Sequence, residues 1–153
     1  MDLSQWFSHQ LQSSAEGFAW AVEQVPVERR LLAPPRQLGD WSAVRHVFHM
    51  LFYEQTIALP SMRQWLGGPR LLVDDLDEEA EWEKGHLLEK LVADFRQVRT
   101  EQIAWLPQFD AALWHAARRT VWGAVTLRWV VTKTYQHTAE HTHDVLRLAL
   151  FWQ

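Results

Sequence analysis

The chain has 153 residues, contains no cysteine and carries a formal net charge of −4. Its length predicts a single domain over 1–153 with room for a hydrophobic core. Without cysteine the chain cannot form disulfides, thiolate metal sites or a cysteine nucleophile, so a transition metal would bind imidazole nitrogen or carboxylate oxygen. The acidic balance and scattered arginines argue against nucleic-acid binding, which needs a basic surface. Ten tryptophans predict a well-filled core, with some left for an aromatic pocket or a subunit interface.

The N-terminal stretch 1–10 has neither a basic nor an apolar run, so we expect no secretion signal. No segment approaches the roughly 18 apolar residues of a membrane span, so we expect no membrane partner. A cysteine-free chain suits a reducing compartment, and we expect a cytoplasmic protein.

The first predicted helix covers 3–25. Its apolar side chains recur every three or four residues, and Asp2 or Ser4 can cap its start. Pro26 ends it. The segment 26–40 contains paired prolines and is predicted to be a loop.

The second predicted helix begins at Ser42, a suitable N-cap, and carries an apolar stripe through 44–55. Pro60 removes a backbone donor and should kink or restart this helix. The sequence WLGGPR at 65–70 ends it. The acidic segment 71–85 has little periodicity, so we expect a loop, part of which covers one end of the molecule.

The third predicted helix spans 88–105 and ends before Pro107. After a turn at Gly123, Thr126 caps a fourth helix that runs through 127–148. No run of alternating apolar and polar residues is long enough to predict a strand. The sequence therefore predicts an all-α four-helix bundle with long connecting loops, a fold in which metal sites are built from inward side chains on facing helices.

The stretch YQHTAEHTHD places His137 and His141 four residues apart on the stripe that otherwise faces the core. Side chains at this spacing are neighbours on a helix and can share one cation. Two ligands do not fill a coordination shell, so a third must come from elsewhere. The second helix offers His46 and His49, one turn apart, and either could reach across the bundle.

Two segments resemble the DinB-like (YfiT-like) metalloenzyme family: WSAVRHVFHMLFYE at 41–54 and WGAVTLRWVVTKTYQHTAEHTHDVLRL at 122–148. The shared pattern is one histidine on the second helix, then a glycine turn, a threonine cap and His-x-x-x-His on the last. The resemblance implies that the metal ligands are His49, His137 and His141. His46 does not match the family position, and we expect it to be a bystander.

The resemblance also implies a divalent metal, zinc or nickel, and in several relatives a low-molecular-weight thiol held as thiolate. Three imidazoles leave positions open for water or substrate, as in catalytic sites. We expect a metal-dependent enzyme, either a thiol-dependent transferase or a related hydrolase or isomerase. A small-molecule substrate would enter at the end bordered by 26–40 and 67–83.

Further residues near the predicted ligands have two interpretations each. Glu140 and Asp144 each follow a histidine by three positions and either orient an imidazole or are solvated surface charges. Tyr53 and Glu54 follow His49 and either assist at the metal or belong to the edge of the bundle.

Two other functions stay open. A non-catalytic module for metal binding or stress response would have a closed fourth ligand, such as Asp144 or Glu140. A carrier of apolar ligands would have a large pocket without metal. The aromatic surplus and the resemblance both favour a homodimer.

Overall fold

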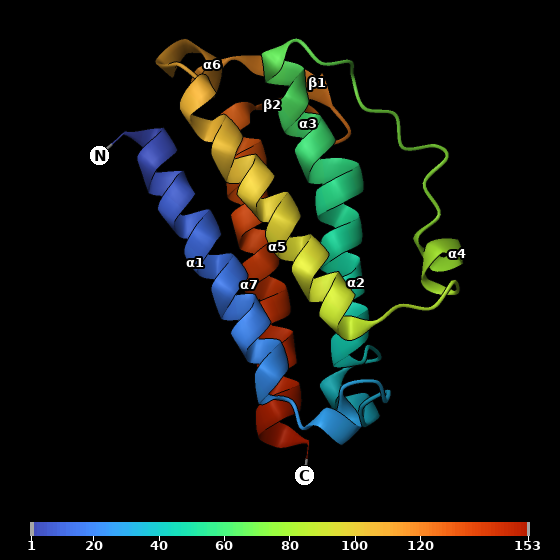
Figure 1. The fold of residues 1–153 in the computed structure, drawn as a ribbon. Coiled ribbons are helices and arrows are strands. Elements are labelled where there is room, and N and C mark those ends of the chain that lie inside the picture. The colour runs from blue at the N-terminus through green and yellow to red at the C-terminus, as the bar shows by residue number, and fades with distance from the viewer. Residues whose placement is uncertain (1, 153) are drawn as a thin grey trace.

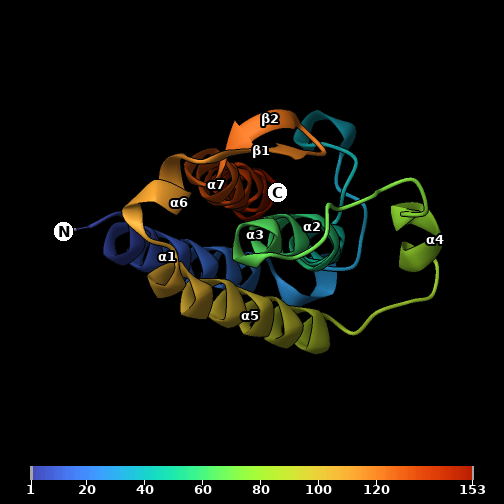
Figure 2. The ribbon, with the colours of Figure 1, turned by 90° about the horizontal axis from the view of Figure 1, so that it is seen from above.

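Four long helices run side by side along the molecule (Figure 1). The computed structural model describes residues 2–152. The long helices are α1 (Leu3–Gln24), α2 (Ala43–Tyr53), α5 (Leu88–Trp105) and α7 (Leu127–Phe151). Around the bundle, α1 packs against α5 and α7, and α2 packs against the same two helices (Figure 2). The predicted four-helix bundle is confirmed.

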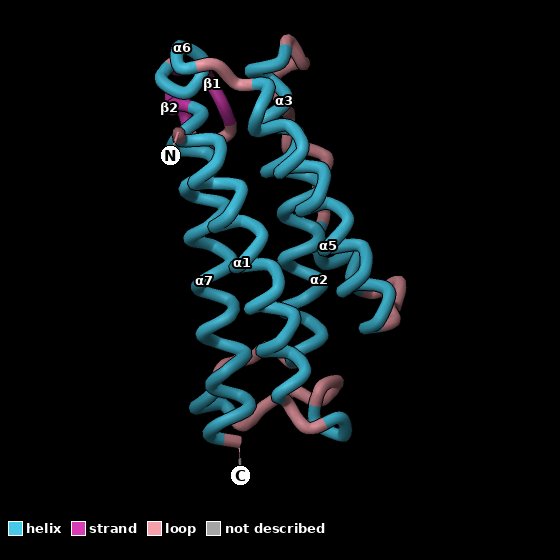
Figure 3. The backbone as a smooth tube through the Cα atoms, turned by 60° about the vertical axis from the view of Figure 1, so that its left-hand side comes forward, coloured by secondary structure: helices cyan, strands magenta, loops and turns pink. Residues whose placement is uncertain are grey.

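One connection between these helices is long because it joins two neighbours that run in the same direction. Helices α2 and α5 both start at the lower end in Figure 1, so the chain returns outside the bundle through 67–87. That return contains the short helix α4 (Glu78–Trp82), which the sequence did not predict within the expected loop 71–85. The other connections lie at the two ends of the bundle (Figure 3).

The helix starts follow from polar caps that satisfy free backbone N–H groups. The Asp2 side chain accepts from Gln5 N, so Asp2 caps α1. The predicted caps Ser42 and Thr126 are confirmed for α2 and α7.

The predicted irregularity near Pro60 is a π-helical turn at Glu54–Ala58, followed by α3 (Leu59–Arg63). Proline cannot donate the backbone hydrogen bond that an α-helix needs at this position. Instead, Leu59 N–H donates to Glu54 O, five residues back. The Glu54 side chain, at the start of this turn, is fully buried.

The prediction that the chain has no strands is wrong. Strands β1 (Ala117–Thr120) and β2 (Gly123–Thr126) form an antiparallel hairpin beside the start of α7. Each has only four residues, too short for an alternating pattern to stand out. Gly123, with φ of +92°, permits the turn. The helix α6 (Ala111–His115) precedes the hairpin, and short 3₁₀ turns lie at Val27–Arg29, Arg36–Leu38, Gln64–Leu66 and Leu106–Gln108.

The core consists of two apolar clusters, one toward each end of the bundle. Tryptophan contributes to it only in part, because Trp65 and Trp114 are buried whereas Trp20 is more than half exposed. Within residues 2–152, no helix has the length and apolar character to cross a membrane.

A buried ion pair joins the long helices near the middle of the bundle. Arg99 of α5 donates to Glu54 Oε1 at 2.5 Å, and both side chains are almost completely excluded from solvent. The same guanidinium donates to Leu11 O of α1 and to Thr138 Oγ1 of α7. Burial raises the pKa of Glu54 despite the opposing effect of the neighbouring Arg99.

Candidate metal centre

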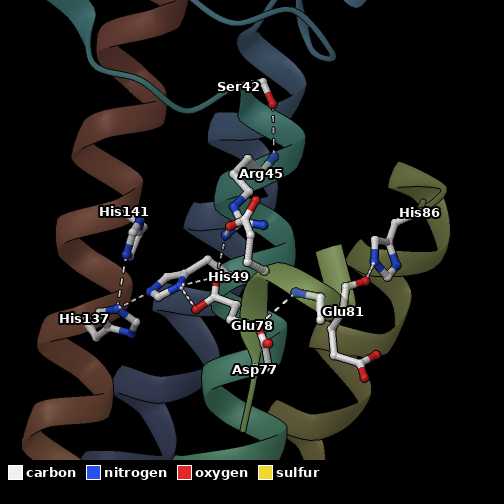
Figure 4. A network of polar contacts seen from close by, with 11 residues as sticks. Ser42, Arg45, His49, Asp77, Glu78, Glu81, His86, His137 and His141 are labelled. Carbon is white, nitrogen blue, oxygen red and sulfur yellow. Dashed lines mark hydrogen bonds and ion pairs between the residues drawn. The ribbon is translucent and has the colours of Figure 1, made fainter. Parts of the chain in front are cut away.

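Three imidazoles from α2 and α7 meet between the two helices (Figure 4). His49 Nε2 lies 3.1 Å from His137 Nε2, and His141 Nε2 lies 3.1 Å from the same atom. The structure therefore brings together the three residues that the resemblance implied as ligands. The convergence has a simple cause, since His137 and His141 are one turn apart on α7 and the first half of α2 packs against that face.

The spacing of these nitrogens fits a divalent ion. With metal–nitrogen bonds of 2.0–2.1 Å, two ligands of a tetrahedral site are about 3.3 Å apart, and two adjacent ligands of an octahedral site about 2.9 Å. The observed 3.1 Å separations lie between these values. One possible ligand atom from each of His49, His137 and His141 lies within 4.8 Å of the other two.

Two of the three imidazoles have a partner at their outer nitrogen. Both oxygens of Glu78 lie near His49 Nδ1, at 2.9 and 3.0 Å. His46 Nδ1 lies 2.8 Å from His141 Nδ1. The Nδ1 atom of His137 is buried and has no hydrogen-bond partner within residues 2–152. Outer partners of this kind fix the tautomer and the orientation of a ligating imidazole.

Arg45 fastens α4 to the bundle and so places Glu78 at the site. Its guanidinium donates to Glu79 Oε2 at 2.9 Å and lies 3.3 Å from Glu78 Oε1. It also lies 5.3 Å from the centre of the Trp41 ring and 4.9 Å from that of Trp82. Charge and cation–π contacts together hold α4 against the start of α2.

Aromatic rings enclose the imidazoles. Trp41 stacks on His141, with ring centres 5.9 Å apart and an interplanar angle of 7°. Tyr53 lies on the other side, with its ring centre 4.2 Å from that of His137. Tyr53 is buried rather than at an exposed edge, and burial raises the pKa of its hydroxyl.

His46, His137 and His141 are held neutral at neutral pH, the form in which histidine binds metal. Burial, reinforced by electrostatic repulsion from His49, Lys133 and Arg99, lowers the pKa of His137 to about 3. Burial and the neighbouring histidines lower the pKa of His141 to about 3. Burial also lowers the pKa of His46 to about 4, against the opposing charge of Asp144.

A surface pocket of about 340 Å³ opens beside His141. It lies between α7 and the end of the 26–40 segment, one of the two segments expected to border the entrance. Its lining combines apolar and charged groups, namely Leu38, Gly39, Asp40, Trp41, His46, His141, Asp144 and Arg147.

Of the carboxylates that the sequence suggested, only Asp144 lies close to a predicted ligand. Glu140 is exposed and accepts from Gln136, so it does not orient an imidazole. A carboxylate oxygen of Asp144 lies within 4.8 Å of ring nitrogens of His46 and His141, but Asp144 is not in the group formed by the three predicted ligands. Glu54 is occupied by Arg99.

Sequence reasoning missed three contributors, Glu78, Trp41 and His46. Glu78 lies in a segment without periodicity. His46 was expected to be a bystander, yet it contacts His141 directly. A signal was available for His46, because its position one turn before His49 places it on the same face of α2.

Comparisons with known proteins support the fold. No protein-family model matches the chain, and no curated protein matches it in sequence. Among solved structures it is similar to YfiT from Bacillus subtilis, described as a probable metal-dependent hydrolase with an unusual four-helix bundle topology. The TM-score is 0.74 at 17% identity, and the match covers 100% of this chain and 91% of that one. The chain therefore has a YfiT-like four-helix-bundle fold.

Proposed function

We propose that this protein is a divalent-metal-dependent enzyme in which His49, His137 and His141 hold the ion. The main observation behind the proposal is that the Nε2 atoms of His49 and His141 each lie 3.1 Å from His137 Nε2. The description of the structurally similar YfiT as a probable metal-dependent hydrolase supports it. Zinc and nickel are the ions we propose, because imidazole suits both.

A divalent ion at such a site acts as a Lewis acid and lowers the pKa of a water or thiol that it binds. The nucleophile in our proposal is a low-molecular-weight thiol or water. A thiol must come from solution, because the chain has no cysteine.

The residues around the cluster favour a catalytic centre over a closed structural one. Among residues 2–152, no carboxylate joins His49, His137 and His141 to form a group of four possible ligands. Three protein ligands leave coordination positions for an exchangeable molecule. A pocket that could hold a small molecule opens beside His141, and Trp41 is part of its lining.

The proposal is tested first by metal content. Protein purified without an immobilised-metal column should contain about one zinc or nickel per chain, measured by inductively coupled plasma mass spectrometry. The variants His49→Ala and His137→Ala should lose it. His143→Ala is the matched control, because His143 is an exposed histidine of the same helix. Wild-type protein that binds neither ion in a direct titration would refute the proposal.

Activity then separates the two nucleophiles. Metal-loaded protein is incubated with activated esters, and with alkylating electrophiles in the presence of glutathione, bacillithiol or mycothiol. Metal-dependent turnover that requires the thiol identifies a transferase, and turnover without thiol identifies a hydrolase. Stoichiometric metal without turnover in either assay would support the non-catalytic alternative.

A further inference from the structure

His46 and His141 make a contact that the three-histidine site does not by itself require. Their Nδ1 atoms are 2.8 Å apart, a hydrogen-bond distance. His46 is 7% exposed and lies on α2, whereas His141 lies on α7. The contact therefore links the two helices that supply the metal ligands.

The positions of the protons decide which histidine donates this hydrogen bond and which accepts it. Two lone pairs cannot bond to each other, so one of the two Nδ1 atoms carries a proton. If His141 Nε2 serves the ion, the His141 proton lies on Nδ1 and is donated. His46 Nδ1 must then be the acceptor, which places the His46 proton on Nε2.

We propose that His46 is a positioning residue that fixes the tautomer and ring orientation of His141, so that Nε2 of His141 faces the metal position. This inference rests on the proposed function. In this role His46 on α2 parallels Glu78 on α4, which contacts the outer nitrogen of His49. His46 is the partner that comes from within the bundle.

The surroundings of His46 support a polar role. The neighbouring α2 residues Val47 and Met50 are fully buried and apolar, so an apolar side chain would suit packing at position 46 as well. The His46 and Trp41 rings pack at a steep angle of 66°, with ring centres 5.4 Å apart. Trp41 and His46 thus confine the His141 ring from two sides.

A competing arrangement uses the same atoms. His46, His141 and Asp144 each place a donor atom within 4.8 Å of the others. A second ion held by this group would make His46 a ligand instead of a positioning residue. Metal stoichiometry distinguishes the two arrangements.

The test compares metal affinity in wild type, His46→Leu, His46→Asn and His46→Ala, measured for zinc by competition with a chromophoric chelator. Asparagine places an acceptor oxygen close to the position of the imidazole Nδ1, whereas leucine and alanine do not. Removing an outer partner lowers metal affinity by about 10–100-fold. We expect this loss in His46→Leu and His46→Ala, and an affinity within about threefold of wild type in His46→Asn. His143→Leu is the matched control and should bind as wild type does.

A second measurement reads the proton positions in wild-type protein and needs no variant to fold. In the zinc-loaded protein, two-bond ¹H–¹⁵N correlation spectra should show His141 protonated at Nδ1 and His46 protonated at Nε2. A His46 ring protonated at Nδ1 would overturn the inference.

Three affinity results would also overturn it. One is unchanged zinc affinity in His46→Leu while His137→Ala loses the ion, which would leave the proposed function intact. Another is two ions per wild-type chain, with one lost in both His46→Leu and Asp144→Asn. The third is no zinc in any variant or in wild type, in which case the proposed function fails as well.

Discussion

Two polar regions lie next to each other inside the bundle, and they differ in the charges that their groups bring together. In the first, Arg99 donates to Glu54, Thr138 and the backbone of α1, so a buried positive charge meets acceptors. In the second, the Nε2 atoms of three imidazoles lie close together, and each presents a lone pair when its ring carries the proton on Nδ1. The two regions adjoin directly, because Thr138 follows His137 on α7.

The difference separates structure from function. A buried ion pair has its counter-charge within the protein and needs no ligand, so breaking it affects the fold. A cluster of lone pairs that converge on one point becomes complete when a cation binds. The same helices thus hold one closed polar region and one open to a ligand.

The largest expected effect is on stability and belongs to the closed region. Arg99→Leu should lower the free energy of unfolding by about 3–5 kcal/mol, because Glu54 is then buried without a counter-charge. Urea denaturation in the presence of a chelator measures this loss. The double variant with Glu54→Leu should recover much of it.

Lys90→Leu provides the control for this prediction. Lys90 forms an exposed ion pair with Asp94 on α5, and such pairs contribute at most about 0.5 kcal/mol. An effect of Arg99→Leu as small as that of Lys90→Leu would mean that the buried pair does not hold the helices together.

The next effect belongs to the open region and depends on metal. Zinc at 100 times its dissociation constant should raise the free energy of unfolding by about 2.7 kcal/mol, because the ion binds only the folded cluster. His49→Ala should abolish this increase while unfolding normally without metal. Equal stabilisation of wild type and His49→Ala by zinc would place the ion elsewhere.

Low pH should reduce the free energy of unfolding of the metal-free protein, because the histidines of this cluster become protonated on unfolding. The folded-state pKa values of His46, His137 and His141 lie at about 4, 3 and 3, below the ordinary 6.5. At a pH between the folded-state values and 6.5, these histidines bind protons in the unfolded chain but not in the folded one. The stabilising contribution is therefore complete above about pH 6.5 and is lost as the pH falls toward 3.

Urea denaturation at pH 7 and pH 5 checks this dependence. We expect a loss of about 2 kcal/mol in wild type, discounted for the partial exposure of two of the rings. His141→Gln should reduce the loss, whereas His143→Gln should leave it unchanged. Stability that is constant or higher at pH 5 would contradict the expectation.

The helices could be predicted from the sequence because the signals that define them are local. Periodic apolar residues and the caps Ser42 and Thr126 act within one or two turns of the chain. The proximity of His137 to His141 is local in the same sense. The approach of His49 from another helix is not, and only the family resemblance indicated it. Metal binding by these three residues stays a prediction.

What the sequence did not reveal depends on docking between distant segments. Glu78 reaches His49 because Arg45 binds α4, a contact that joins residues far apart in the chain. Glu54 pairs with Arg99, which lies 45 positions further along the chain. The residues nearest to the histidines in sequence do not indicate either contact.

The smallest expected effect is on zinc affinity, and it measures how much Glu78 of α4 contributes to the three-histidine site. Glu78→Gln keeps the shape of the side chain and an acceptor for His49 Nδ1–H but removes the negative charge. Loss of this outer partner's charge should weaken zinc binding by about tenfold, the lower end of the range for such changes. Glu79→Gln is the matched control, because Glu79 is mostly exposed and contacts Arg45 but not His49. If Glu79→Gln weakens zinc binding equally, the docking of α4 by Arg45 controls the affinity. If only Glu78→Gln does, the hydrogen bond to His49 controls it, and the open region depends on a carboxylate from outside the four-helix bundle.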